Sequence, residues 1–235
     1  MKSCAFIFAR GGSKQIPNKN LLKLGDKTLI AHAVSQAKNI SAIERVIVST
    51  DSDEIAFEAM SAGAEIPFLR PSELATDESP EWLSWQHALR TLQEIENYTP
   101  DIFISLPTTS PLREDIDILN CLSVFNENDC DAVISVTESK RNPYFNMIRN
   151  ENGIAKIVCT NETKVTRRQD APRLYDMTTV CYVVKSNFIL QNSRLFEGKI
   201  RISEVPSIRA IDIDTIDDFE YAKYIYERKF NSQNE

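Results

Sequence analysis

Histidine is almost absent from this chain of 235 residues, which contains only His32 and His87. Zinc sites and Ser-His-Asp catalysis depend on histidine, so the sequence disfavours both kinds of chemistry. The five cysteines are an odd number and include no C-x-x-C pair. This pattern favours free thiols in a reducing cytosol over a disulfide framework, and we therefore expect a cytoplasmic protein.

Long apolar runs are also missing. The apolar runs at 5–9 and 102–106 are far shorter than the roughly 20 residues that a helix needs to cross a bilayer. We expect no signal peptide, no anchor and no membrane partner. Positive charge is in deficit, because 27 Lys and Arg residues against 34 Asp and Glu residues give a net charge of −7. That sign disfavours nucleic acid as a partner, while a local basic cluster can still bind a small anion.

What is present is the composition of an ordinary globular protein. Hydrophobic residues make up 42% of the chain and charged residues 26%, which excludes the disordered and fibrous classes. Domains commonly contain roughly 100 to 200 residues, so we expect a single domain over residues 1–235.

Short apolar runs alternate with longer segments of helical periodicity over the first 140 residues. We predict strands at 3–9, 45–50, 102–106 and 132–137 and helices at 27–38, 52–62, 80–96 and 115–126. This alternation indicates an α/β fold with a mostly parallel sheet flanked by helices.

The pattern changes after about residue 140. Short strand-like pieces at 144–149, 154–158 and 178–185 are interpreted as an antiparallel excursion, an inserted arm at about 140–185. A strand at 208–213 and a closing helix at 216–230 return to the α/β pattern. The strands of the arm have few apolar residues and are poorly placed to bury themselves. We therefore expect the arm to pair with a second subunit in a homodimer.

The first predicted strand leads into a loop that combines two glycines, a hydroxyl and three basic side chains: Arg10, Gly11, Gly12, Ser13, Lys14 and Lys19. Glycines allow a close approach to the backbone, and the C-terminal ends of parallel strands are where open α/β sheets bind ligands. We predict a polyphosphate site there. Neither G-x-G-x-x-G nor G-x-x-x-x-G-K-[ST] is present, so this is neither a dinucleotide fingerprint nor a Walker loop. The alternative is a solvated basic turn.

Two carboxylates occur close to the C-terminus, in the sequence I-D-I-D-T. If the period of a strand continues through this sequence, Asp212 and Asp214 point to one face, because side chains alternate with a period of two. Carboxylates on one face repel each other unless a cation joins them, and Mg²⁺ accepts such oxygen ligands together with substrate phosphates. The alternative makes Asp214 the N-cap of the last helix and Asp212 a surface residue.

A third segment follows the strand predicted at 102–106. Its candidates for binding a polar substrate are Thr108, Thr109, Ser110 and Arg113. A helix-capping turn is the alternative. Residues 167–173 concentrate three arginines, whose forked guanidinium groups suit a carboxylate or a phosphate.

The motifs in chain order are A-R-G-G-S-K-x-I-P-x-K-N, L-R-P-x-E-L-A-T-D, T-S-P-L-R, R-R-Q-D-A-P followed by Y-D-M, and D-I-D-T. Together, over nearly the whole chain, they resemble the acylneuraminate cytidylyltransferases, also called CMP-sialic acid synthetases. The Kdo cytidylyltransferases are the nearest rivals. The first loop, in which Lys14 is followed by P-N-K-N at 17–20, favours the sialic acid branch.

The resemblance implies a Rossmann-like nucleotidyltransferase fold and an activity. CMP would pass from CTP to the anomeric hydroxyl of a nonulosonic acid, with release of pyrophosphate, in a cytoplasmic reaction that requires Mg²⁺. A non-catalytic regulator that binds a nucleotide or a sugar on the same fold is the alternative from another class.

The resemblance also assigns roles to residues. The nucleotide would lie against Arg10, Gly12, Ser13, Lys14, Lys19 and Asn20, with Arg70 helping to position it. Asp212 and Asp214 would hold the metal, and the groups acting in catalysis would be Arg10, Lys14, Lys19 and Asp212. In the dimer, the arm of one subunit would bring Arg168 and Lys140 close to the substrate carboxylate of the other.

Two departures from the sequences of the sialic acid enzymes narrow the choice of sugar substrate. Gln15 stands in place of a glycine, and Pro107-Thr108 replaces the start of Q-P-T-S-P. In addition, Y-D-M-T-T at 175–179 resembles the branch that activates legionaminic acid. We therefore favour a sialic-acid-like nonulosonate over N-acetylneuraminate itself.

Overall fold

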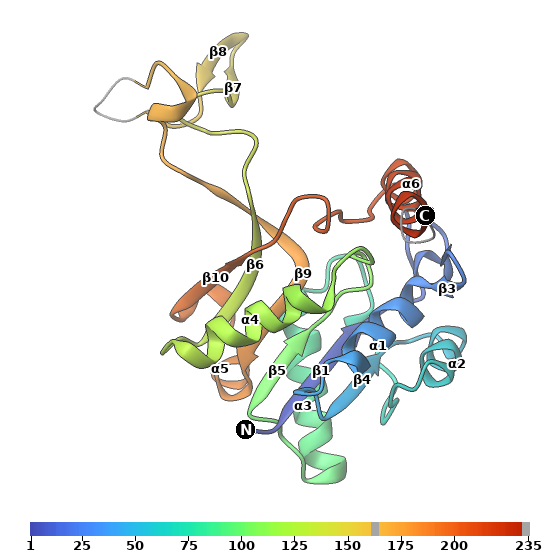
Figure 1. Cartoon of the computed structure of the whole chain (residues 1–235). Coiled ribbons are helices and arrows are strands. Elements are labelled where there is room, and N and C mark those ends of the chain that lie inside the picture. Colours follow the sequence, from blue (N-terminus) through green and yellow to red (C-terminus); the bar gives the residue numbers. More distant parts are fainter. Residues whose placement is uncertain (161–164, 232–235) are drawn as a thin grey trace.

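The computed structural model describes residues 1–160 and 165–231 (Figure 1). Within these residues the strands of the main sheet follow the spatial order β10-β6-β9-β5-β1-β4. Their bounds are β1 Ser3–Phe8, β4 Arg45–Ser49, β5 Ile102–Ser105, β6 Ala132–Glu138, β9 Tyr175–Lys185 and β10 Ile200–Glu204. The pairs β1–β4, β1–β5 and β6–β10 are parallel, while β9 runs antiparallel between β5 and β6. The predicted α/β class with a mostly parallel sheet is confirmed.

Buried apolar side chains explain why these segments form strands. In β1, Phe6 is fully buried and lies in register with Ile47 of β4 and Ser105 of β5. Its ring stacks on that of Phe103, with centroids 4.4 Å apart. A strand of such residues is stable only when both faces of the sheet are covered.

Helices cover both faces. The helices are α1 Leu29–Asn39, α2 Asp53–Ser61, α3 Glu81–Glu96, α4 Asp115–Glu127, α5 Ser186–Gln191 and α6 Ile216–Asn231. Helices α1, α2 and α4 contribute to the core on one face, and α3 and α5 to the core on the other. Helix α6 packs over the short hairpin of β2 Lys23–Leu24 and β3 Lys27–Thr28, where a third apolar cluster forms. No helix within the described residues is long and apolar enough to cross a membrane.

The arm leaves the main sheet between β6 and β9, and Figure 1 shows it extending away from the rest of the molecule. At its end β7 Ile148–Glu151 and β8 Ile154–Ile157 form an antiparallel hairpin. The side chains of Ile148 and Ile154 are 65% and 63% exposed. The prediction that 178–185 belongs to this excursion is wrong, because that segment is part of β9 and pairs with β5 and β6 in the main sheet.

The strand predicted at 208–213 is also wrong. These residues, which the structure describes in full, form a turn and an irregular loop instead. The turn closes where Arg209 N–H donates to the carbonyl oxygen of Pro206 at 2.9 Å. Ile213 is buried, but in the apolar cluster beneath α6 and not in the sheet. The edge strand beside β6 is β10, which the sequence analysis missed together with α5.

Candidate active site

Loops from several strands meet at the C-terminal ends of β1, β4 and β5. The amide of Asn20 donates to the carbonyl oxygen of Arg10 at 2.9 Å, and the hydroxyl of Thr108 donates to the amide oxygen of Asn20 at 2.6 Å. The backbone N–H of Gly11 donates to Asp51 at 2.8 Å, and a Cβ at Gly11 would come within 3.1 Å of the Ser52 Cβ atom. These hydrogen bonds fix the conformation of the basic loop. The buried side chain of Asn20 links the loop to Thr108.

The two basic side chains at the start of this loop face an acidic one. Arg10 and Lys14 both form ion pairs with Asp77, the latter at 2.5 Å. The two cations lower the pKa of the Asp77 carboxyl, the hydrogen bond from Lys14 being the largest cause. Between the loops lies a cavity of about 420 Å³, lined by Arg10, Gly12, Ser13, Lys14, Ala75, Thr76, Asp77 and Glu78. A cavity lined by cations, a hydroxyl and an open glycine fits a chain of phosphates.

Arg70 lies under a neighbouring cavity of about 220 Å³. Its guanidinium is buried, donates to the hydroxyl of Ser49 at 3.2 Å and lies 5.4 Å from the ring centroid of Phe8. Burial lowers the pKa of Arg70 to about 10. The cavity also contains the Ser79 hydroxyl, which is buried and finds no partner among the described residues. Sequence reasoning missed Ser79, because a serine before Pro80 indicates only a helix start.

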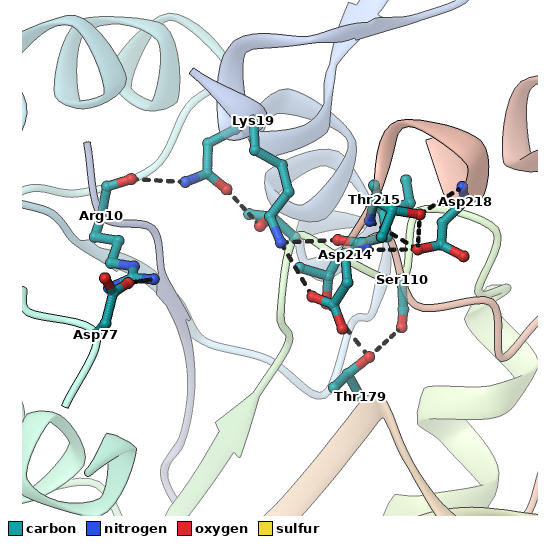
Figure 2. A network of polar contacts seen from close by, with 12 residues as sticks. Arg10, Lys19, Asp77, Ser110, Thr179, Asp214, Thr215 and Asp218 are labelled. Atoms are coloured by element: carbon teal, nitrogen blue, oxygen red, sulfur yellow. Dashed lines mark hydrogen bonds and ion pairs between the residues drawn. The ribbon is translucent and has the colours of Figure 1, made fainter. Parts of the chain in front are cut away.

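Lys19 connects the basic loop to the C-terminal acids (Figure 2). Its ammonium donates to the carbonyl oxygen of Ile213 at 2.8 Å and lies 3.4 Å from a carboxylate oxygen of Asp214. The Lys19 side chain is only 15% exposed. The two halves of the site, which the sequence predicted separately, therefore meet at this residue.

Asp212 and Asp214 differ in their surroundings. Asp212 is half-buried, and its Oδ1 atom is buried without a partner in the described part of the chain. Burial raises the pKa of Asp212 and the Asp214 charge adds to this, while the hydroxyls of Thr109 and Thr179 act the other way. Asp214 is exposed.

The pair fits a hard cation, because an orphaned buried carboxylate oxygen next to a second carboxylate is the donor set that Mg²⁺ prefers. Within residues 1–160 and 165–231 no group of three or more His, Cys, Asp or Glu side chains is placed to hold a metal. The two carboxylates would therefore share the ion with water and substrate oxygens, as Mg²⁺ sites commonly do.

The alternative that Asp214 caps the last helix is wrong. Thr215 has that role, since its hydroxyl accepts from the N–H of Asp218 at 3.3 Å and its own N–H donates to the Asp218 carboxylate at 2.7 Å. Asp214 is thus left for its ion pair with Lys19.

The hydroxyl-rich segment divides into two groups. The hydroxyl of Thr108 is engaged in its hydrogen bond to Asn20. The hydroxyls of Thr109 and Ser110 instead meet that of Thr179 at 3.3 and 2.7 Å, beside the acidic loop (Figure 2). Thr179 of β9 is a candidate site residue that the sequence analysis did not identify, because only the topology of the sheet brings it there.

Arg113 lies beneath this segment. It is buried and donates to the carbonyl oxygens of Val180, at 2.5 Å, and Pro107, and to the side chain of Gln36 at 2.9 Å. Burial lowers its pKa to about 10. The buried Arg113 guanidinium therefore stabilises the loop from inside the protein. This is not the position expected of a substrate-binding residue.

Lys140 and Arg168 are exposed and lie in the arm. The arm extends away from the rest of the molecule (Figure 1). Arg168 lines a separate cavity of about 380 Å³ with other arm residues. The chain by itself does not bring these two side chains to the other predicted residues. Their action across a dimer stays a prediction.

A mixed α/β sheet with a basic glycine loop at one strand end, joined through Lys19 to a pair of carboxylates, is the arrangement expected of the nucleotidyltransferase class. The family model described as cytidylyltransferase matches residues 4–235. The chain belongs to this cytidylyltransferase family, and the resemblance drawn from the sequence is confirmed.

Related proteins agree with this membership. The chain is 35% identical over 223 residues to the CMP-N,N'-diacetyllegionaminic acid synthase of Campylobacter jejuni, which covers 95% of this chain and 94% of the relative. It is 30% identical over 226 residues to a pseudaminic acid cytidylyltransferase of the same species, covering 96% and 97%.

Among solved structures, the CMP-2-keto-3-deoxy-manno-octonic acid synthetase complexed with CTP aligns with a TM-score of 0.70 at 18% identity, covering 97% of this chain and all of the other. This likeness shows the shared fold.

Proposed function

We propose that this chain transfers CMP from CTP to the anomeric hydroxyl of a sialic-acid-like nonulosonic acid and releases pyrophosphate. In this step a bond forms between the anomeric oxygen and the α-phosphorus, the bond between the α-phosphorus and the bridging oxygen of pyrophosphate breaks, and the hydroxyl loses a proton. The single observation that carries the proposal is the contact of Lys19 with Asp214, which joins the basic loop to the acidic loop.

The basic loop would neutralise the triphosphate. Phosphoryl transfer needs charge neutralisation and in-line placement more than covalent help, and the pairing of Arg10 and Lys14 with Asp77 shows that both cations face the same space. Gly12 and Ser13 line that space. Arg70, buried beside Phe8, would support the nucleotide from below.

Asp212 and Asp214 would hold Mg²⁺, the predicted cofactor. When bound, the ion would neutralise charge that develops on the α-phosphate oxygens. Lys19 keeps Asp214 close to the basic loop, and the hydroxyls of Thr109 and Thr179 lie beside Asp212. In this arrangement the acidic side of the site would lie opposite the cations that would receive the leaving pyrophosphate.

The sugar would enter from the side of the arm. The exposed Ile148 and Ile154 of the hairpin favour pairing with another subunit, so we propose a homodimer in which Arg168 and Lys140 approach the partner's sugar carboxylate. An odd number of cysteines without a C-x-x-C pair supports a cytoplasmic reaction.

The test is an assay of pyrophosphate release with CTP, Mg²⁺ and a panel of sugars. Legionaminic, pseudaminic and N-acetylneuraminic acids and Kdo would be compared, with the Asp212→Asn variant as a control for contaminating enzymes. We expect turnover with a sialic-acid-like nonulosonate, and with legionaminic-type acids before N-acetylneuraminic acid. Turnover with Kdo alone would assign the chain to the Kdo-type enzymes, and CTP binding without turnover of any sugar would make it a regulator.

Nucleotide choice is tested in the same assay. CTP should support much faster release than ATP, GTP or UTP with the preferred sugar. Equal release with ATP would contradict the proposed reaction.

A further inference from the structure

The loop that bears Asp212 and Asp214 belongs to no strand, so sheet pairing does not fix its position. At its start Val205 N–H donates to the carbonyl oxygen of Val136 at 2.8 Å, and near its end Ile213 N–H donates to that of Thr109 at 2.9 Å. The seven residues between them form a turn and an extended piece. Something else must hold this stretch in place.

Lys19 holds the end of this stretch, at Ile213 and Asp214, and Arg209 holds its middle. The Nε and Nη2 atoms of Arg209 donate to the two carboxylate oxygens of Asp117 at 2.9 and 2.8 Å. Asp117 is 1% exposed and Arg209 24%. Parallel double hydrogen bonds of this kind fix both distance and orientation, which a single hydrogen bond does not. The hydrogen bond from Arg209 to Asp117 raises the pKa of the arginine.

Asp117 is itself fixed. Its carboxylate accepts from the backbone N–H of Glu114 at 3.0 Å, in the capping box that starts α4. Helix α4 follows directly from the segment of Thr109 and Ser110, which Arg113 braces from beneath. The double hydrogen bond therefore connects the acidic loop to the hydroxyl-rich loop on the other side of Asp212.

We propose that Arg209 is a positioning residue for the two carboxylates. Its ion pairs are with Asp117 and Glu114 and not with either of them. It sets the path of residues 205–215 and thereby where Asp212 and Asp214 stand relative to each other. The inference rests on the proposed function for what the carboxylates bind. The path of the loop does not depend on that function.

The conservative variant Arg209→Lys keeps the charge but loses the double hydrogen bond. We expect faster hydrogen–deuterium exchange across 205–215 in the metal-free protein. In the presence of CTP, the dissociation constant for Mn²⁺, measured by its electron paramagnetic resonance signal, should rise roughly tenfold, as for other residues that orient metal ligands. Half-saturation by Mg²⁺ in the assay should shift equally, while the KM for CTP changes little.

Arg45 provides a matched control. It donates to both carboxylate oxygens of Glu65 and is 20% exposed, but it lies on β4 at the other edge of the sheet. Arg45→Lys should lower the melting temperature by a similar amount as Arg209→Lys and leave Mn²⁺ binding and exchange over 205–215 unchanged. The second variant, Asp117→Asn, should reproduce the effects of Arg209→Lys.

The outcomes separate the two proposals. Unchanged exchange and unchanged Mn²⁺ binding in Arg209→Lys, with Mn²⁺ binding lost in Asp212→Asn, would overturn the role of Arg209 and leave the proposed function intact. If the wild-type protein with CTP binds no Mn²⁺, the metal role of the carboxylates fails. Exchange over 205–215 then decides by itself whether Arg209 holds the loop.

Discussion

The ammonium nitrogen of Lys19 lies 3.4 Å from a carboxylate oxygen of Asp214, although the two residues are 195 positions apart in the chain. Lys19 also donates to the backbone of Ile213, so it positions the acidic loop as well as balancing its charge. In a site where phosphates and a cation would both bind, this lysine stands between them. Its removal should affect both ends of the site.

Replacing Lys19 by Met keeps the aliphatic stem and removes the charge. Loss of a charge that stabilises the transition state should lower kcat/KM on the order of a hundredfold. The control is Lys23→Met in β2, whose side chain is exposed. Steady-state kinetics with CTP and the preferred sugar measure the difference, and equal rates in the two variants would leave Lys19 with a structural role alone.

Asp212→Asn and Asp214→Asn each keep the size of the side chain and remove one charge. Folding should survive, and kcat should fall on the order of a hundredfold or more, because a metal site loses a ligand charge. Thr215→Ala is the matched control in the same loop. It removes the helix cap, which costs roughly 1 kcal/mol of stability, and should leave turnover nearly intact. Turnover near the wild-type level in both Asn variants, over a wide range of Mg²⁺ concentrations, would remove the metal site.

Local chemistry explains what was predictable from the sequence. The basic loop follows a buried strand, so both its residue types and its place at a strand end follow from short-range patterns. For the two acids only the residue types and their spacing were predictable, because the loop that bears them belongs to no strand. The prediction of a strand at 208–213 was wrong. Alternating isoleucines are equally compatible with burial of Ile213 in a separate apolar cluster. Local pattern carries no information on which of these two burials occurs.

Non-local contacts explain what was missed. Thr179 reaches the site only because β9 inserts antiparallel between β5 and β6, and no local signal specifies that neighbour. The role of Arg113 could not be predicted either. The local sequence is the same whether the arginine faces a ligand or the carbonyl oxygens of Pro107 and Val180.

Arg113→Met should act on stability first. It removes the donor to the buried carbonyl oxygen of Val180 and to the half-buried one of Pro107, and leaving a buried acceptor unpaired costs about 1 to 3 kcal/mol. Urea denaturation should therefore show a clear fall in the free energy of unfolding, whereas Arg90→Met, at an exposed position of α3, should stay within about 0.5 kcal/mol of the wild type. An Arg113→Met protein of unchanged stability with a raised KM for the sugar would return Arg113 to the substrate-binding residues.

Asp77 forms ion pairs with Arg10 and Lys14, the cations that CTP would contact. Asp77→Asn should therefore lower the KM for CTP. The change should be about two- to fivefold, because these ion pairs are exposed to solvent. The folded-state pKa of Asp77 is lowered, so its stabilising contribution is present above the unfolded pKa and is lost as pH falls through the folded pKa. Acid titration of the melting temperature should show this loss in the wild type and not in Asp77→Asn. A raised KM in the variant would mean that Asp77 orders the loop for the nucleotide and does not compete with it.

The last prediction concerns the arm. If Arg168 acts on the partner's site, Arg168→Ala and Asp212→Asn should each be poorly active, and a mixture that exchanges subunits should recover activity. A heterodimer then has one site with an intact core and an intact arm, so random pairing restores about a quarter of the wild-type sites. The mixture of Asp212→Asn with Lys19→Met is the control, because both changes damage the core of their own subunit and every heterodimer site stays defective. Sedimentation velocity at micromolar concentration checks that the protein is a dimer. A fully active monomer would exclude a site completed by the arm of another subunit, and Arg168 would then have to be assigned a role within its own chain.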